Sequence, residues 1–304
     1  MGIVQDLLKT ENVTRVLKPT VDNAANLQNS INTAYKNHRE ALKEIEEYYN
    51  SRVHGLTNLA GEKTLANVDD FINLTKEYAD AIAEQHMKYY AVNRELWQYY
   101  TDNEFKDYAV KRASADRAVY DYVRGFSDTD FNGITWKQVM TGNNRAGKTI
   151  SDLWGKALEG VDLSDAEKLT YIAQDIARRS GRLTTELTAR YDPTKPRYAR
   201  VPQGEKTCAF CYMLASRGFV YGSEDKAKFK HGGTDTYHMH CDCLPVPTWG
   251  RAAIQGYNPR EMYKNYREAY EITKDMGKST TEYKNILSVM RRNNPILKDA
   301  VIKP

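Results

Sequence analysis

Cys208-Ala209-Phe210-Cys211 and His238-Met239-His240-Cys241-Asp242-Cys243 are the two stretches that decide the fold of this chain. All four cysteines of the 304 residues lie in them. A Cys-x-x-Cys turn brings two thiolates within reach of one ion, and a distant His-x-x-Cys-x-Cys can complete the tetrahedron of sulfur and nitrogen ligands that zinc prefers. The sequence therefore predicts a Zn2+ site that cross-links the two stretches.

This window offers more ligands than one ion needs. We favour His238 as the fourth ligand, because a tight turn would bring it to the same metal as Cys241. His240 and Cys243 compete for that place, and a Cys-x-Cys strand would point both thiols to one face. Two disulfides, which are typical of secreted chains, or reduced buried thiols are the alternatives. The predicted metal residues are Cys208, Cys211, His238, Cys241 and Cys243.

The role expected for this zinc is structural. Catalytic zinc keeps an open coordination position with a general base nearby, whereas thiolate-rich sites are closed. The candidate bases Glu224, Asp225 and Asp242 have no spacing that commits one of them to activating a water. The pattern favours a staple for a small β-rich module over a hydrolase.

Composition and charge indicate which broad class of protein this is. Hydrophobic residues make up 41% of the chain, charged residues 28%, and the net charge is +4. No apolar run reaches the roughly 20 residues of a membrane span, and the start, MGIVQDLLKTENVTRVLK, is too polar for a signal peptide. We expect a cytoplasmic product that does not contact membranes.

The basic character is C-terminal. Residues 251–304 contain 11 Lys and Arg against 6 Asp and Glu, a local charge of +5. Such a segment can contact nucleic acid or an acidic protein surface, and a solvated helix face is the alternative.

Residues 1–126 read as an elongated helical domain. Val21 to Asn50 has few helix breakers, and Gly55 and Gly61 are expected to mark a turn. From Val68 to Val123 there is neither Gly nor Pro, and apolar residues recur at helical spacing. Thr101-Asp102-Asn103 is the expected break between two helices of a hairpin. His86 beside the apolar face is read as a packed histidine.

Residues 127–196 are predicted to be a second helical region. Gly142 to Thr149 fits the phosphate-loop pattern G-x-x-x-x-G-K-[ST], but no buried strand precedes it, so we expect a loop that caps a helix starting near Ser151. Ser164 to Glu167 reads as a capping box that opens another helix. The apolar face of that helix is opposed by arginines that we expect to be solvated: Arg178, Arg179, Arg182 and Arg190.

The rest of the chain divides into a metal module, residues 197–250, and a basic helical segment, residues 251–304. Each predicted strand is too short to form a core by itself, so a zinc cross-link would contribute folding free energy there. The predicted strands are Tyr198–Val201, Gly218–Tyr221 and Cys243–Val246, and the predicted C-terminal helices are 259–276 and 280–292. The fold class expected is mainly α.

The order of these features resembles the MuF-like minor head proteins of tailed bacteriophages. The resemblance is carried by Ile176-Ala177-Arg178-Arg179, Cys208-x-x-Cys211 and His238-x-x-Cys241-x-Cys243. Thr207 to Gly218 is similar to the versions in phages of actinobacteria. The family typically closes with His-Pro-x-Cys-Arg-Cys, from which this chain departs at Met239 and Asp242.

The resemblance implies a non-enzymatic structural protein of the virion, associated with the portal and major capsid proteins inside the head and involved in head assembly or in the fate of the packaged DNA. Some relatives carry the label of capsid maturation protease, but no Ser/His/Asp or Cys/His arrangement here supports it. The alternatives are that protease or a zinc-dependent nuclease, a nucleic-acid-binding zinc module, and a nucleotide-binding protein that uses Lys148.

Overall fold

The computed structural model describes residues 24–59, 65–101, 104–124, 131, 133–204, 206–221, 241–250 and 252–298. These residues form nine helices and four short strands, which confirms the mainly α prediction. No helix among them is long and apolar enough to cross a membrane. The histidines predicted as ligands, His238 and His240, lie outside the described residues.

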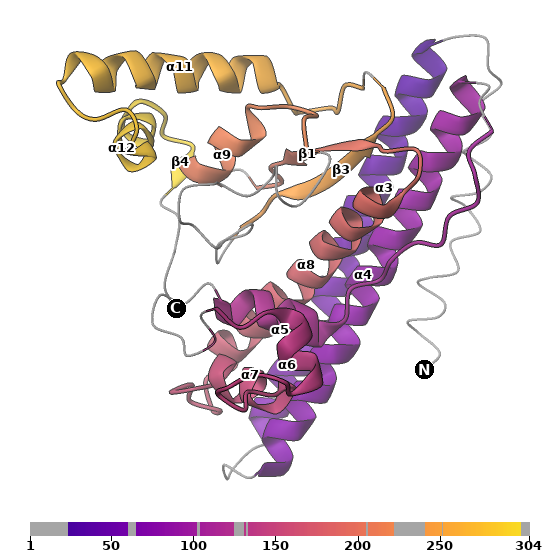
Figure 1. Cartoon of the computed structure of the whole chain (residues 1–304), viewed down its shortest axis with the longest axis vertical. Helices are drawn as coiled ribbons and strands as arrows, with labels where there is room; N and C mark the ends of the chain where they lie inside the picture. Colours follow the sequence, from indigo (N-terminus) through magenta and orange to yellow (C-terminus); the bar gives the residue numbers. More distant parts are fainter. Residues whose placement is uncertain are drawn as a thin grey trace.

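Two long helices form the hairpin that organises the molecule (Figure 1). They are α3 (Ala24–Leu59) and α4 (Leu65–Thr101). The first runs through Gly55, so the turn expected at that glycine is wrong. The second ends at Thr101, at the break predicted from Thr101-Asp102-Asn103.

A third long helix, α8 (Ala166–Tyr191), packs against both α3 and α4. One hydrophobic core includes Tyr49 of α3, Ile82 of α4 and Ile176 of α8. Because α8 has neighbours on every side, nearly all of its second half is buried. The expected solvated arginine face is wrong for Arg179 and Arg182, which are 3% and 1% exposed, whereas Arg178 and Arg190 are partly exposed.

The N-terminus of α8 differs by one residue from the predicted capping box. Asp165, and not Ser164, is the N-cap, and its carboxylate accepts a hydrogen bond from the Lys168 amide at 2.9 Å. The Ser164 hydroxyl donates instead to Asp162, at 2.8 Å. A carboxylate placed there also suits the positive end of the helix dipole.

The segment after α4 is the main departure from the predicted helices. Residues 104–114 have no regular secondary structure, and helix resumes only at α5 (Ala115–Arg124). The segment lies along α8, where Thr184 Oγ1 accepts from the Ala113 amide at 3.0 Å and Ser180 Oγ donates to the Ala113 carbonyl at 3.0 Å. Hydroxyls of α8 thus satisfy backbone groups that a helix would have paired internally.

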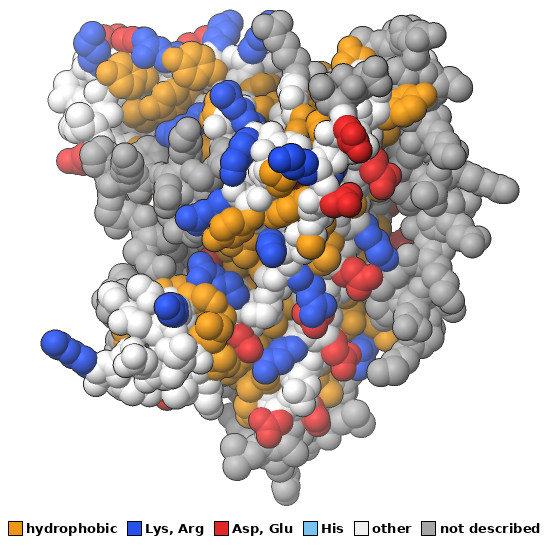
Figure 2. Space-filling view, turned by 45° about the vertical axis from the view of Figure 1, so that its right-hand side comes forward, with side chains coloured by type: hydrophobic (Ala, Val, Ile, Leu, Met, Phe, Trp, Pro, Cys, Tyr) orange, Lys and Arg blue, Asp and Glu red, His pale blue; other side chains and the backbone are white. Residues whose placement is uncertain are grey.

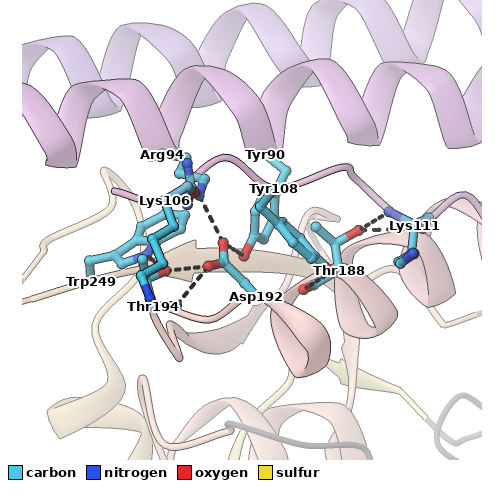
Figure 3. Close-up of polar contacts among 9 residues, drawn as sticks. All are labelled: Tyr90, Arg94, Lys106, Tyr108, Lys111, Thr188, Asp192, Thr194 and Trp249. Atoms are coloured by element: carbon cyan, nitrogen blue, oxygen red, sulfur yellow. Dashed lines mark hydrogen bonds and ion pairs between the residues drawn. The ribbon is translucent and has the colours of Figure 1, made fainter. Parts of the chain in front are cut away.

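Asp192, at the C-terminal cap of α8, fixes the start of this segment (Figure 3). Its fully buried carboxylate accepts hydrogen bonds from Tyr90 Oη at 2.9 Å and from Arg94 Nε at 3.0 Å. Arg94 also donates to the Lys106 carbonyl, and Thr194 donates its amide to Asp192 at 2.8 Å. One buried carboxylate therefore joins α4, the 104–114 segment and the turn after α8.

The segment that fits the phosphate-loop pattern, Gly142 to Thr149, lies between two short helices, α6 (Trp136–Thr141) and α7 (Ile150–Ala157). Gly142 ends α6 with a positive φ of 67°, and Thr149 is the N-cap of α7, with its hydroxyl donating to Asp152 at 2.6 Å. Helix α6, and not a strand, leads directly into the loop, so the predicted helix-capping role is confirmed. The nucleotide-binding alternative therefore lacks its strand–loop–helix context.

The strands of the metal module agree only in part with those predicted. β1 (Arg197–Val201) pairs antiparallel with β3 (Leu244–Thr248), and β2 (Thr207–Cys208) pairs parallel with β4 (Leu297–Lys298). The predicted strand at 218–221 is reduced to a single bridge between Tyr221 and Tyr198. Prolines in β3 cannot donate to a further strand, which favours a sheet of two.

Three helices complete this end of the molecule: α9 (Ala209–Ala215), α11 (Pro259–Asp275) and α12 (Tyr283–Asn293). The last two confirm the predicted C-terminal helices. They pack on α9 around a small separate core that includes Met213, Ala269 and Leu287. Figure 1 shows this group at the opposite end of the molecule from α5, α6 and α7.

Candidate metal centre

The first half of the candidate centre is a sulfur-capped turn. Cys208 ends β2 and is the N-cap of α9, and its Sγ accepts a hydrogen bond from the Cys211 amide at 3.1 Å. The thiol takes the place that a Ser or Asp oxygen usually has at a helix start. This turn directs both sulfurs to the same buried space, as the Cys-x-x-Cys spacing predicts.

The second half comes from the residues just before β3. The sulfurs of Cys211 and Cys241 are 3.4 Å apart, and those of Cys211, Cys241 and Cys243 all lie within 4.8 Å of one another. Cys208 belongs to the same cluster. All four side chains are at most 1% exposed, and none of them forms a disulfide. The structure thus brings together all four cysteines of the chain.

This geometry fits a metal better than a disulfide. A disulfide requires sulfurs about 2.05 Å apart, which is far shorter than the 3.4 Å between Cys211 and Cys241. Sulfurs at the corners of a tetrahedron with bonds of about 2.3 Å to zinc would be about 3.8 Å apart. The donor set is also chemically suited to a thiophilic ion. Cys211, Cys241 and Cys243 could therefore hold a metal ion together.

The structure bears on the choice of the fourth ligand, which the sequence left open. Cys243, the competitor to His238, lies in the cluster with 0% exposure. The sulfurs close enough to share one ion are those of Cys211, Cys241 and Cys243, and Cys208 packs in the same buried cluster outside this group of three. The assignment of His238 stays a prediction, because it lies outside the described residues.

Two buried arginines surround the second half of the centre. Arg182 of α8 donates from Nε to the Cys243 carbonyl at 3.0 Å and from Nη2 to the Cys241 carbonyl. Arg200 of β1 directs Nη2 at the Cys241 sulfur, 3.5 Å away. The two side chains are 1% and 0% exposed. Positive charge is therefore held against the thiols in a region from which water is excluded.

The electrostatic result is one preferred thiolate. Burial opposes ionisation of Cys241, but hydrogen bonds from the thiols of Cys211 and Cys243, with the charges of Arg182 and Arg200, hold the pKa of Cys241 well below its ordinary value. Hydrogen bonds to Cys208, Cys241 and Cys243, with burial, raise the pKa of the Cys211 thiol. The thiolate is the metal-binding form of cysteine, so Cys241 is the thiol of the cluster that this environment holds most readily in that form.

Asp242, one of the candidate bases, has a structural contact. Its Oδ2 accepts a hydrogen bond from the Gly204 amide at 2.8 Å, and Thr207 Oγ1 donates to the same oxygen at 3.4 Å. A Cβ placed on Gly204 would lie 2.8 Å from that oxygen, so a larger residue there would displace the Asp242 carboxylate. Asp242 therefore ties the turn before β2 to the Cys241–Cys243 loop. The other two candidates, Glu224 and Asp225, lie outside the described residues.

A groove of about 790 Å³ lies beside the centre, between α3 and the metal module. Arg182 and Asp242 border it, and across it α3 contributes both basic and acidic side chains, including Arg39 and Glu46. Arg178 is already engaged in two hydrogen bonds to Glu46, at 2.6 and 2.7 Å. The mixed charge assigns no ligand to the groove.

The arginines are the part of the site that sequence reasoning missed. Arg182 was expected to be solvated, and Arg200 had no predicted role beyond its place in a strand. One feature of the sequence could have indicated that Arg200 is buried. The other residues of its predicted strand are apolar or aromatic, as Tyr198-Ala199-Arg200-Val201 shows. Such a strand is buried, and a buried arginine requires an anionic partner.

Comparison with known proteins assigns the chain to a protein family. The family model of the VG15 protein matches residues 18–269, which include α3 to α9, all four cysteines and most of α11. The chain belongs to the VG15 protein family. The VG15 family is a family of viral proteins of phages. No curated protein and no solved structure matches the chain.

Membership of the VG15 family confirms the phage origin expected from the sequence at this coarser level. The MuF-like identity and the actinobacterial branch stay predictions. The match covers both the long helices and the metal module, so the VG15 family model describes both parts of the chain.

Proposed function

We propose that the chain is a structural minor head protein of a tailed phage, MuF-like and of the actinobacterial-phage branch, with a structural Zn2+ centre of four cysteines. The observation that carries the proposal is the convergence of all four buried cysteines at one point in a protein of the VG15 family. A closed, thiolate-rich site is typical of structural zinc.

The zinc would act by joining short elements that have little core of their own. It would connect the turn between β2 and α9 to the loop before β3, two places that lie about 30 residues apart in the chain. The free energy of binding zinc to such a site becomes free energy of folding, about 10–16 kcal/mol in zinc-finger peptides. The centre thus has a function that requires no catalysis.

Metal content is the experiment that tests the centre. Elemental analysis of protein purified without chelator is expected to give one zinc per chain. Cys208→Ser and Cys243→Ser are each expected to lose it, and His238→Ala to retain it. Loss in His238→Ala with retention in Cys243→Ser would assign the histidine as the fourth ligand. A wild-type protein with no metal and four reactive thiols would refute the centre.

The proposed place of the protein is inside the virion, with the portal and major capsid proteins as partners. Support comes from the phage family and from the long α3–α4 hairpin, a shape suited to contacts along a neighbouring subunit. Quantitative mass spectrometry of purified particles is the test. The chain is expected in few copies per particle, in fractions that contain the portal protein. Its absence from mature particles would contradict this placement.

The proposal includes a second kind of partner: residues 251–304 would contact the packaged DNA. Arg291 and Arg292 lie in the last turn of α12. On the face drawn in Figure 2, Lys and Arg side chains lie beside Asp and Glu side chains and form no continuous basic surface. Binding is therefore expected to be weak and to fall with salt. Gel-shift titrations of wild type and of Arg291→Glu/Arg292→Glu at two salt concentrations test this contact.

A further inference from the structure

Two guanidinium groups reach the cysteine cluster from different elements. Arg182 comes from the middle of α8 and holds the carbonyls of Cys241 and Cys243 with separate nitrogens. Arg200 comes from the centre of β1 and contacts the Cys241 sulfur. The Cys241–Cys243 loop is therefore held at its backbone by one arginine and at a sulfur by the other.

Charge explains why both positions hold arginine. Four thiolates around a divalent ion carry a net charge of −2, and an uncompensated charge in a dry interior is costly. Lysine or arginine near the sulfurs lowers that cost, and arginine offers several donors in a fixed plane. Glu186, 2% exposed, is a buried carboxylate of this region, facing Tyr198 together with Arg200.

Geometry gives the second reason. Cys241 and Cys243 precede β3 and lie in irregular backbone. The fork of Arg182 fixes the two carbonyls of this loop relative to α8, which is packed against both long helices. Groups that hold ligands in place from outside the coordination sphere tune metal affinity.

We infer that Arg182 and Arg200 are positioning residues of the metal centre, which hold the Cys241–Cys243 loop in its ligating form and balance the charge of the thiolates. The inference rests on the metal centre proposed above. It also makes metal binding and the packing of α8 against the module energetically coupled.

Zinc affinity tests this inference. In competition with a chromophoric chelator, Arg200→Gln and Arg182→Gln are each expected to bind Zn2+ about 10–100-fold more weakly than the wild type. Arg200→Lys, which keeps the charge, is expected to lie between the wild type and Arg200→Gln. Arg178→Gln is the matched control: it lies on α8 one turn from Arg182, pairs with Glu46, and is expected to lose stability without a change in zinc affinity.

Cobalt substitution supplies a readout that a general loss of stability would not move. Removing the donor to the Cys241 sulfur in Arg200→Gln is expected to shift the thiolate-to-Co2+ charge-transfer band, whereas Arg178→Gln is expected to keep the wild-type spectrum. Unchanged affinity and spectrum in Arg200→Gln would overturn the inference. If Arg200→Gln does not fold, Arg200→Lys decides: wild-type affinity and spectrum there would overturn the requirement for the planar donor. A wild-type protein that binds neither ion would instead refute the proposed metal centre itself.

Discussion

Gly181 lies where α8 packs tightly against α4. A Cβ built there would lie 2.4 Å from Cδ2 of His86 and 2.8 Å from Cγ2 of Ile82. Helix propensity alone would favour alanine by about 1 kcal/mol, but overpacking a buried contact costs about 1–3 kcal/mol or more. We expect Gly181→Ala to lower the free energy of unfolding, measured by denaturant titration.

Gly155 of α7 provides the control for that substitution. It also lies inside a helix, and nothing lies within 4 Å of the Cβ that alanine would add. Gly155→Ala is therefore expected to be neutral or to stabilise by up to about 1 kcal/mol. Equal effects of the two substitutions would contradict the close approach of α8 to α4.

His86 is the packed histidine that the sequence predicts, and it makes stability depend on pH. Its Nδ1 lies 2.9 Å from Thr185 Oγ1, and burial together with the charge of Arg182 lowers its pKa to about 3. The unfolded chain protonates this histidine near pH 6.5, whereas the folded protein keeps it neutral. Stability is therefore full above about pH 6.5 and is lost as pH falls toward 3, by up to about 1.4 kcal/mol per pH unit.

The measurement is the free energy of unfolding between pH 7 and 4 for the wild type and His86→Asn. The slope is expected to be smaller in the variant, by about one proton. His38, whose pKa burial and His86 also lower, leaves a residual slope of the same sign. Metal release at low pH affects both proteins, so the difference between the slopes isolates His86. Identical slopes would argue against a neutral buried His86.

At the scale of elements, α8 supports the 104–114 segment through hydroxyls one turn apart. Ser180, Thr184 and Thr188 each bond to the backbone of that segment. Thr184→Val keeps the shape of the side chain but leaves the Ala113 amide without its acceptor, which costs about 1–3 kcal/mol. We expect that loss of stability, with faster hydrogen exchange of residues 110–114.

Thr170 on the same helix is the matched control. Its Oγ1 is buried and has no hydrogen-bond partner within the residues that the structure describes. Thr170→Val is expected to be neutral or stabilising, since removing an unpaired buried hydroxyl removes a desolvation cost. If both substitutions have the same effect, the hydroxyls of α8 do not hold the segment.

These elements also show what sequence periodicity can and cannot predict. It located the end of α4 and the two C-terminal helices, because their signals are local: breakers, caps and apolar spacing. It assigned residues 104–114 to a helix, because the hydroxyls that hold the segment extended lie about 70 residues later in the chain. For the same reason it found the cysteines, whose spacing is local, but missed Arg182 and Arg200, whose partners are distant.

At the scale of the whole molecule, the described residues form one large hydrophobic core and several smaller ones. The larger core includes side chains from α3 to α8, whereas α9, α11, α12 and β4 share a small one. A third cluster, with Trp97 and Val246 among its members, connects the long hairpin to β1 and β3. The small core has fewer buried apolar side chains than the larger core to offset the entropy of ordering its elements, so we expect it to depend more on the proposed metal cross-link.

Chelation of the proposed metal is therefore expected to act unevenly across the protein. Hydrogen exchange after treatment with a zinc chelator is expected to rise in α9, α11, α12 and β3, while α5 and α7 keep their protection, since their side chains lie in the larger core. Cys243→Ser is expected to give the same pattern without chelator. A uniform rise in exchange would mean that the centre stabilises the protein as one cooperative unit, whereas no rise anywhere would mean that the four cysteines contribute to the core only as buried thiols.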